Sequence, residues 1–146
     1  MRNFYLIFEH LPLTILTILF FCLFYDFNFY IMFLCFLFGW LIDVDHLYDY
    51  FLYASKNSIK YNLKEFLSGN YFNKSKKIII FLHSYEISIF IIIFAIIIDE
   101  KFLFIAFAHF AHLIQDTIRN KVRLLSYFFF YRAAVRFNSI KICSHK

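Results

Sequence analysis

The stretch LIDVDH, residues Leu41–His46, ends an apolar run with two carboxylates and one imidazole. The run before it, from Phe29 to Ile42, contains no charged residue. Polar groups of this kind carry a desolvation penalty beside hydrocarbon unless they bind something that compensates them. The stretch therefore poses two linked questions: which fold brings these residues together with others, and what they bind there.

The composition of the 146-residue chain is typical of a membrane protein. Hydrophobic residues make up 62% of the sequence and the mean hydropathy is +0.66, whereas ordinary soluble domains are roughly 45–50% apolar. The length suffices for one domain, so we expect residues 1–146 to form a single transmembrane helical domain. The three cysteines lie in apolar runs or in the tail, which predicts free thiols rather than disulfides.

Four apolar segments predict an all-α fold, specifically a polytopic membrane helical bundle. They cover about residues 11–25, 29–42, 78–98 and 102–118. None alternates in hydrophobicity as a strand of a β-barrel would, so transmembrane helices are favoured. A further segment, residues 124–137, has Arg132 and Arg136 one turn apart, which predicts an interfacial helix with its cations at the headgroups. A fifth span over the same residues stays open.

Charges flank the apolar segments unequally. The polar loop 53–77 carries six lysines and the C-terminal segment 119–146 is also basic, whereas the turns at 26–28 and 99–101 together carry three acids and one lysine. Short basic loops stay in the cytoplasm, so we expect the loop 53–77 to face the cytoplasm of a bacterial inner membrane. Topology of this kind explains the formal charge of +5 without a nucleic acid, and no nucleic-acid partner is expected.

The unusual polar residues of four separate segments fall at this same cytoplasmic level. They are His10, Asp43, Asp45, His46, His83, Glu86, His109, His112 and Asp116. Helical spacing places His109, His112 and Asp116 on one stripe of a helix. It likewise places His83 and Glu86 on one face of the next helix along the bundle. We therefore expect the whole set to converge at one end of the bundle.

Imidazoles and carboxylates without a thiolate predict a site for a divalent metal ion. Zinc is the first expectation, with manganese or iron(II) as alternatives, and either one or two ions are compatible with the residues. The metal ligands that we expect are His10, Asp43, His46, His83, His109, His112 and Asp116. The two remaining carboxylates, Asp45 and Glu86, are the expected catalytic residues, each as a candidate general base.

Several of these residues have a second interpretation. His10 would also be compatible with a place at the membrane interface, and His109 with a hydrogen bond to a neighbouring helix. Asp45 is equally suited to hold the tautomer of a ligating histidine, and Glu86 to pair with a lysine. Asp49, one helical turn beyond Asp45, is expected to be solvated.

At these residues the chain resembles the small membrane-bound, predicted metal-dependent hydrolases of bacteria and archaea. Their pattern is a His near the start of the first helix, Asp-x-Asp-His after an apolar helix, His-Ser at the next helix and His-x-x-x-Asp near the end of another. The matching residues are His10, DVDH at 43–46, HS at 83–84 and HLIQD at 112–116. The chain lacks the His-Arg pair that many relatives carry shortly before His-Ser, and has Lys76 and Lys77 in that region.

The resemblance implies a membrane-embedded metal-dependent hydrolase. A substrate that reaches such a site would be a lipid, a lipid-linked phosphate or another membrane-associated ester, with the basic residues after Ile118 near its headgroup. The same residues also suit a non-catalytic metal-binding protein or ion transporter, a bis-histidine haem protein, or a structural subunit of a membrane complex. Clustered carboxylates argue against haem, and a homo-oligomer stays open.

Overall fold

The computed structural model describes residues 10–120 and 122–143, and within these ranges the protein is built from helices and loops. The prediction of an all-α fold is confirmed. The described residues contain one isolated antiparallel bridge, between Lys77 and Asn138, and no β-strand. All three cysteines are free, as predicted.

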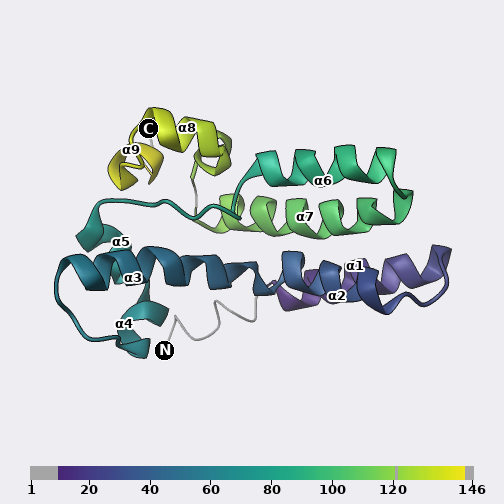
Figure 1. Ribbon diagram of the computed structural model, residues 1–146, viewed down its shortest axis with the longest axis horizontal. Coiled ribbons are helices and arrows are strands. Elements are labelled where there is room, and N and C mark those ends of the chain that lie inside the picture. The colour runs from purple at the N-terminus through teal and green to yellow at the C-terminus, as the bar shows by residue number, and fades with distance from the viewer. Residues whose placement is uncertain (1–9, 121, 144–146) are drawn as a thin grey trace.

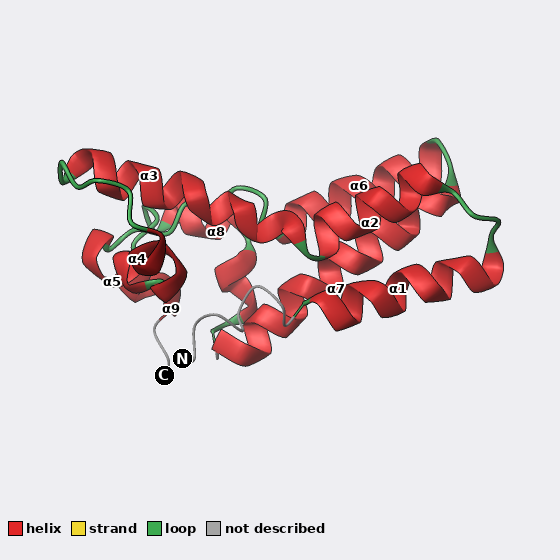
Figure 2. Ribbon diagram, turned by 90° about the horizontal axis from the view of Figure 1, so that it is seen from below, coloured by secondary structure: helices red, strands yellow, loops and turns green. Residues whose placement is uncertain are grey.

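Two helical hairpins form the half of the molecule drawn at the right of Figure 1. The first joins α1 (Leu11–Phe24) to α2 (Phe29–Gly39), and the second joins α6 (Tyr85–Ile97) to α7 (Leu103–Asn120) through η3 (Glu100–Phe102). Figures 1 and 2 show the four helices running nearly parallel to the long axis of the molecule. The short turns thus make antiparallel neighbours of each pair, as their lengths predict.

The turns of the two hairpins lie together at one end of the molecule. The side chain of Asn28 accepts a hydrogen bond from the backbone N–H of Ile31 and so caps the start of α2. The hydroxyl of Tyr25 donates to a carboxylate oxygen of Glu100 over 2.9 Å and ties the first turn to the second. This shared end places the opposite ends of all four helices side by side.

Helix α7 lies against each of the other three hairpin helices. The buried core between them consists of Phe21, Ile31, Cys35, Ile91, Ile105, Ala106 and Ala108. Gly39 permits the closest approach, because a Cβ added there would lie 2.6 Å from Oγ1 of Thr14 and 3.2 Å from Cβ of Ala108. The missing side chain of Gly39 therefore sets how near α2 comes to α1 and α7.

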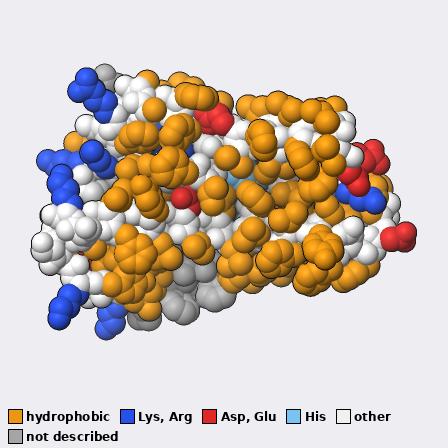
Figure 3. All heavy atoms as spheres, viewed as in Figure 1, with side chains coloured by type: hydrophobic (Ala, Val, Ile, Leu, Met, Phe, Trp, Pro, Cys, Tyr) orange, Lys and Arg blue, Asp and Glu red, His pale blue; other side chains and the backbone are white. Residues whose placement is uncertain are grey.

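The other half of the molecule contains shorter helices. They are η2 (Leu41–Asp45), α3 (His46–Lys56), α4 (Leu63–Ser68), α5 (Asn70–Ser75), η4 (Leu124–Tyr127), α8 (Phe129–Ala134) and α9 (Ser139–Cys143). Cations gather on this half, as the blue side chains at the left of Figure 3 show, while acidic side chains lie at the tip of the hairpins. Most Lys and Arg residues thus lie at one end of the long axis, whereas the turns at the other end carry Asp26, Asp99, Glu100 and Lys101. The other described carboxylates lie away from this tip.

The third apolar segment becomes helical later than predicted. Residues 78–84 contain no regular helix, and α6 begins at Tyr85. Two carboxylates, from α3 and η2, bind backbone N–H groups of this irregular stretch. Oδ2 of Asp49 accepts from the N–H of Ile79 over 2.8 Å, and Oδ2 of Asp45 accepts from the N–H of Leu82 over 2.6 Å.

The single interfacial helix predicted for residues 124–137 is wrong. The segment consists of η4, an extended Phe128 and the six-residue helix α8. Arg132 is fully buried instead of lying at a surface, within the field of the carboxylates of Glu86, Asp45 and Asp49. Its three guanidinium nitrogens are buried without a hydrogen-bond partner among the described residues. The sequence spacing of Arg132 and Arg136 did not reveal this burial.

The apolar helices are short. Among the described residues, no individual helix combines the length and the hydropathy that a bilayer span requires; Phe29–Gly39 with Leu41–Lys56 meets both criteria as a pair, across a bend of 55°.

Substitution of Gly39 tests the close approach of α1, α2 and α7. Gly39→Ala should lower the free energy of unfolding by about 1–3 kcal/mol, because the new Cβ overlaps Thr14 and forces the helices apart. Ser55→Ala, at an exposed position of α3, serves as the control and should stay within about 0.5 kcal/mol of wild type. Thermal unfolding followed by circular dichroism measures both. Equal stability of Gly39→Ala and wild type would contradict this account of the packing.

Candidate metal centre

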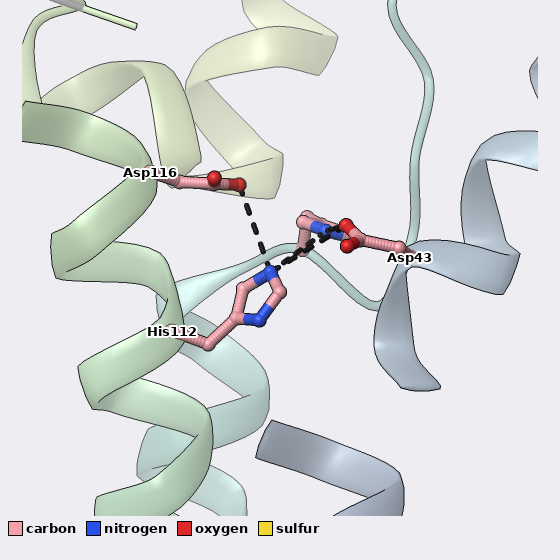
Figure 4. A group of neighbouring side chains, drawn as sticks. Asp43, His112 and Asp116 are labelled. Atoms are coloured by element: carbon pink, nitrogen blue, oxygen red, sulfur yellow. Dashed lines mark hydrogen bonds and ion pairs between the residues drawn. The ribbon is translucent and has the colours of Figure 1, made fainter. Parts of the chain in front are cut away.

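Four side chains from three segments converge where the hairpins meet the shorter helices. Asp43 comes from η2, His83 from the irregular segment before α6, and His112 and Asp116 from α7. One ligand atom from each lies within 4.8 Å of the others. Figure 4 shows Asp43, His112 and Asp116 turned toward one another from η2 and α7. The sequence prediction that these four residues come together is confirmed.

Local structure brings each side chain into place. His112 and Asp116 lie one turn apart on α7 and so share a face of the helix. The chain leaves the α-helical geometry of α2 at Trp40 and continues as the 3-10 turns of η2, which carry Asp43. The irregular backbone before Tyr85 holds His83 against η2 rather than along the α6 axis. A straight continuation of either helix would have placed these residues differently.

Four of the separations between the donor atoms are close to those around a tetrahedral ion. Ligand atoms bound to zinc at about 2.1 Å lie about 3.4 Å from one another in a tetrahedron. Nε2 of His83 lies 3.2 Å from Oδ1 of Asp43 and 3.3 Å from Nε2 of His112. Nε2 of His112 lies 3.6 Å from Oδ1 of Asp43 and 3.7 Å from Oδ2 of Asp116. The two shorter distances are within hydrogen-bond reach, and all four suit donors that surround a common centre.

The imidazoles of His83 and His112 face one another through their Nε2 atoms. Nδ1 of His112 lies 3.0 Å from the carbonyl oxygen of Gly39, so we assign its hydrogen to Nδ1. Nδ1 of His83 lies 3.5 Å from Oδ2 of Asp45, which favours a hydrogen on that nitrogen too. Both Nε2 atoms then present lone pairs across 3.3 Å. A cation, either a proton or a metal ion, has to lie between them to offset this repulsion.

The carboxylates around His83 stabilise positive charge there. Burial alone would lower the pKa of His83, but its hydrogen bonds to Asp43 and Asp45 raise that pKa to about 9. Burial would likewise raise the pKa of Asp45, but the bonds from His83 and from the backbone N–H of Leu82 hold it below its ordinary value. The ionised Asp45 therefore orients His83, in the arrangement that supports many metal-bound histidines.

His10 and His46 each lie beside one carboxylate of the group. Nε2 of His10 lies 3.2 Å from Oδ1 of Asp116, and its ring stacks on that of His112 with 3.8 Å between centroids. Nε2 of His46 lies 3.6 Å from Oδ1 of Asp43, and its ring centroid lies 4.6 Å from that of His83. The structure thus brings six of the seven expected ligands together.

An open cavity of about 340 Å³ adjoins the group. His10, Asp43, His46 and Asp116 lie in its wall, whereas the rings of His83 and His112 are buried behind them. Trp40 and apolar side chains from η2, α3, α4 and α5 line the rest, together with Arg119, Asn120 and Tyr127. The cavity gives a small molecule access to one side of the donor group.

Two expected site residues lie elsewhere. Both ring nitrogens of His109 are engaged, because Nδ1 lies 2.6 Å from Oγ of Ser88 and Nε2 lies 2.9 Å from the carbonyl oxygen of Leu82. The carboxylate of Glu86 accepts the backbone N–H groups of Phe129 and Phe130 and so begins α8. His109 is therefore the histidine bonded to a neighbouring segment that we weighed as its alternative, and Glu86 stabilises a helix start.

Three residues around the centre were missed or misjudged from the sequence. Tyr127 donates a hydrogen bond to Oδ2 of Asp116 over 3.3 Å. Asp49 is buried rather than solvated, because it binds the backbone N–H of Ile79. Arg132 is buried within the field of the carboxylates of Glu86, Asp45 and Asp49. None of the three belongs to a recognisable motif, and Asp49 gave a signal only through its place one turn after Asp45.

Comparisons of this chain with models of known protein families, with curated proteins and with solved structures found no match. The resemblance to membrane-bound hydrolases therefore remains a prediction that depends on its motifs.

Parallel substitutions of two histidines on α7 separate a ligand from a supporting residue. At saturating zinc, His109→Gln should keep the wild-type zinc content while the free energy of unfolding falls by about 1–3 kcal/mol, because the Ser88 and Leu82 contacts are disturbed. His112→Gln should lose bound zinc, because its Nε2 faces the donor group. Zinc content by mass spectrometry and thermal unfolding measure the two effects. Loss of zinc in His109→Gln with His112→Gln unaffected would reverse the assignment.

Proposed function

We propose that this protein is a metal-dependent hydrolase that works at a membrane surface. The observation that carries the proposal is the convergence of Asp43, His83, His112 and Asp116 within 4.8 Å, beside a cavity that is open to small molecules. A divalent ion bound there with a further position open to water would lower the pKa of that water toward 7 and polarise the bond to be cleaved. Donor types and spacing favour zinc.

The side chains around the cavity would support the metal ligands and bind the substrate. Asp45 holds the ring of His83, and Tyr127 holds Asp116, so the donor set keeps its geometry while substrate enters. The apolar residues Trp40, Leu67 and Phe72 lie in the cavity wall and would exclude bulk water around a hydrocarbon group. Arg119 lies in the same wall, where its charge favours an anionic headgroup.

The surface of the hairpins supports a place in the bilayer. Leu16, Leu23, Phe90 and Ile96 are 61%, 78%, 67% and 76% exposed, and apolar side chains cover the hairpin half of the face drawn in Figure 3. An apolar surface of this extent needs cover. The gathering of Lys and Arg at the end away from the hairpin turns favours lipid as that cover, because it agrees with the positive-inside rule.

In this arrangement the metal centre lies where the hairpins leave the hydrocarbon. The hairpin helices α1, α2, α6 and α7 are the membrane part, and η2 and the segment before α6 lie outside it. A substrate at this level would be a lipid, a lipid-linked phosphate or another membrane-associated ester. The base role expected of Asp45 and Glu86 is not part of the proposal, because both carboxylates accept backbone N–H groups.

Metal content and turnover test the catalytic proposal together. Detergent-purified wild type should contain stoichiometric zinc, and Asp43→Ala and His112→Ala should lose it. Release of phosphate from phosphatidic acid or of nitrophenol from a nitrophenyl phosphodiester in mixed micelles should fall by at least about 100-fold in both variants. Asp99→Ala, at the far end of the hairpins, is the matched control and should retain zinc and activity.

The outcomes discriminate between the alternatives. Zinc-free wild type with unchanged folding would refute the metal centre. Zinc that depends on His112, without turnover of phosphoesters or carboxylic esters, would favour the non-catalytic metal-binding alternative over the hydrolase.

Cysteine labelling tests the membrane arrangement. In a chain whose own cysteines are replaced by serine, Asp26→Cys should react with an impermeant maleimide added to intact cells, because the hairpin turns face outward. Lys60→Cys should react only after the membrane is opened, because the loop 53–77 faces the cytoplasm. Both positions are exposed, so burial does not limit either reaction. Labelling of both from the same side would contradict the proposal.

A further inference from the structure

The donor group holds more ligands than one tetrahedral ion uses. A zinc ion that takes Asp43, His83, His112 and Asp116 has four protein ligands, yet His10 and His46 still face the same two carboxylates. A single octahedral ion bound by all six would leave no position for substrate or water. The imidazoles of His10 and His46 therefore need a role that is separate from the binding of this ion.

The carboxylate of Asp116 faces a different histidine with each of its oxygens. Oδ1 lies 3.2 Å from Nε2 of His10, whereas Oδ2 lies 3.7 Å from Nε2 of His112. A carboxylate that binds one ion with each oxygen bridges two metals, which in two-metal hydrolases lie about 3.5–4 Å apart. The stacking of the His10 ring on the His112 ring at 3.8 Å between centroids places the two imidazoles at a similar offset.

The six donors also divide by their position relative to the cavity. His83 and His112 are buried behind its wall, while His10, His46, Asp43 and Asp116 lie in the wall itself. Both carboxylates face histidines of the two kinds, because Asp116 faces His10 and His112. Asp43 faces His46 as well as His83 and His112. The other ring nitrogens of His10 and His46 have no hydrogen-bond partner among the described residues, so no such bond prevents either ring from turning toward an ion.

From this arrangement we propose a second divalent metal site on the cavity side of the first, with His10 and His46 as its own ligands and Asp116 and Asp43 shared. The inference rests on the proposed metal centre and defines it as dinuclear. The inner ion is held by the buried histidines and the outer ion faces the cavity. A phosphoester bound in the cavity would then meet two positive charges, which suits a substrate with two negatively charged oxygens.

Metal stoichiometry tests this inference without any assay of turnover. Metal-free wild type in detergent is loaded with zinc and freed of excess by gel filtration. It should retain two equivalents per chain, while His10→Ala should retain one. Leu67→Ala removes an apolar side chain from the same cavity wall and is the matched control, which should retain two equivalents. Circular dichroism verifies that the helix content of each variant is that of wild type.

A measurement on the unaltered protein complements the variants. Loading with manganese(II) should give the broad electron paramagnetic resonance spectrum of two coupled ions about 3.5–4 Å apart, and His10→Ala should give the six-line spectrum of an isolated ion. One zinc equivalent in wild type, with a six-line manganese spectrum, would overturn the second site while the proposed hydrolase stands. Two equivalents in His10→Ala would overturn the assignment of His10. Absence of zinc from wild type would overturn the metal centre itself, and this inference with it.

Discussion

The structure around the candidate centre depends on two imidazole nitrogens that face each other across 3.3 Å. Neither ring can turn away without leaving a partner, since the Gly39 carbonyl oxygen lies beside Nδ1 of His112 and Asp45 beside Nδ1 of His83. Lone pairs held this close require a positive charge between them, and the neighbouring carboxylates supply the negative charge that retains it. A proton satisfies the pair in the absence of metal, as the raised pKa of His83 indicates. A divalent ion would satisfy the pair and both carboxylates together.

A small number of backbone features hold these two imidazole nitrogens in place. Gly39 brings α2 against α7, and the same residue provides the carbonyl group that lies against His112. The break after α2 turns the chain into η2, which carries Asp43. Asp45 and Asp49 accept hydrogen bonds from the backbone of the segment that carries His83 and so attach it to η2 and α3. The same carboxylates thus stabilise both the centre and the fold. A substitution that disturbs one would therefore also disturb the other.

The polar supports behind the centre explain why so many charges are buried in an apolar chain. Glu86 begins α8, which carries Arg132 inward toward Glu86, Asp45 and Asp49. Tyr127, at the end of η4, holds Asp116. His109 connects α7 to Ser88 of α6 and to the Leu82 carbonyl group, and so steadies the backbone next to His83. The C-terminal helices therefore act as part of the wall around the centre rather than as a separate surface element.

The sequence by itself determined the helical class, the two antiparallel pairs and most of the residues that converge. It did so because apolar runs, short turns and helical spacing depend only on neighbours in the chain. It also separated the ends of the molecule by charge. Only the tertiary structure decided which polar residues face the common centre. His109 and Glu86 have the same chemistry and nearly the same helical positions as the ligands, but their partners lie on segments distant in sequence. The burial of Arg132, in the field of Glu86, Asp45 and Asp49, likewise depends on segments distant in sequence. So does the irregular stretch before α6, where the backbone N–H of Leu82 binds Asp45.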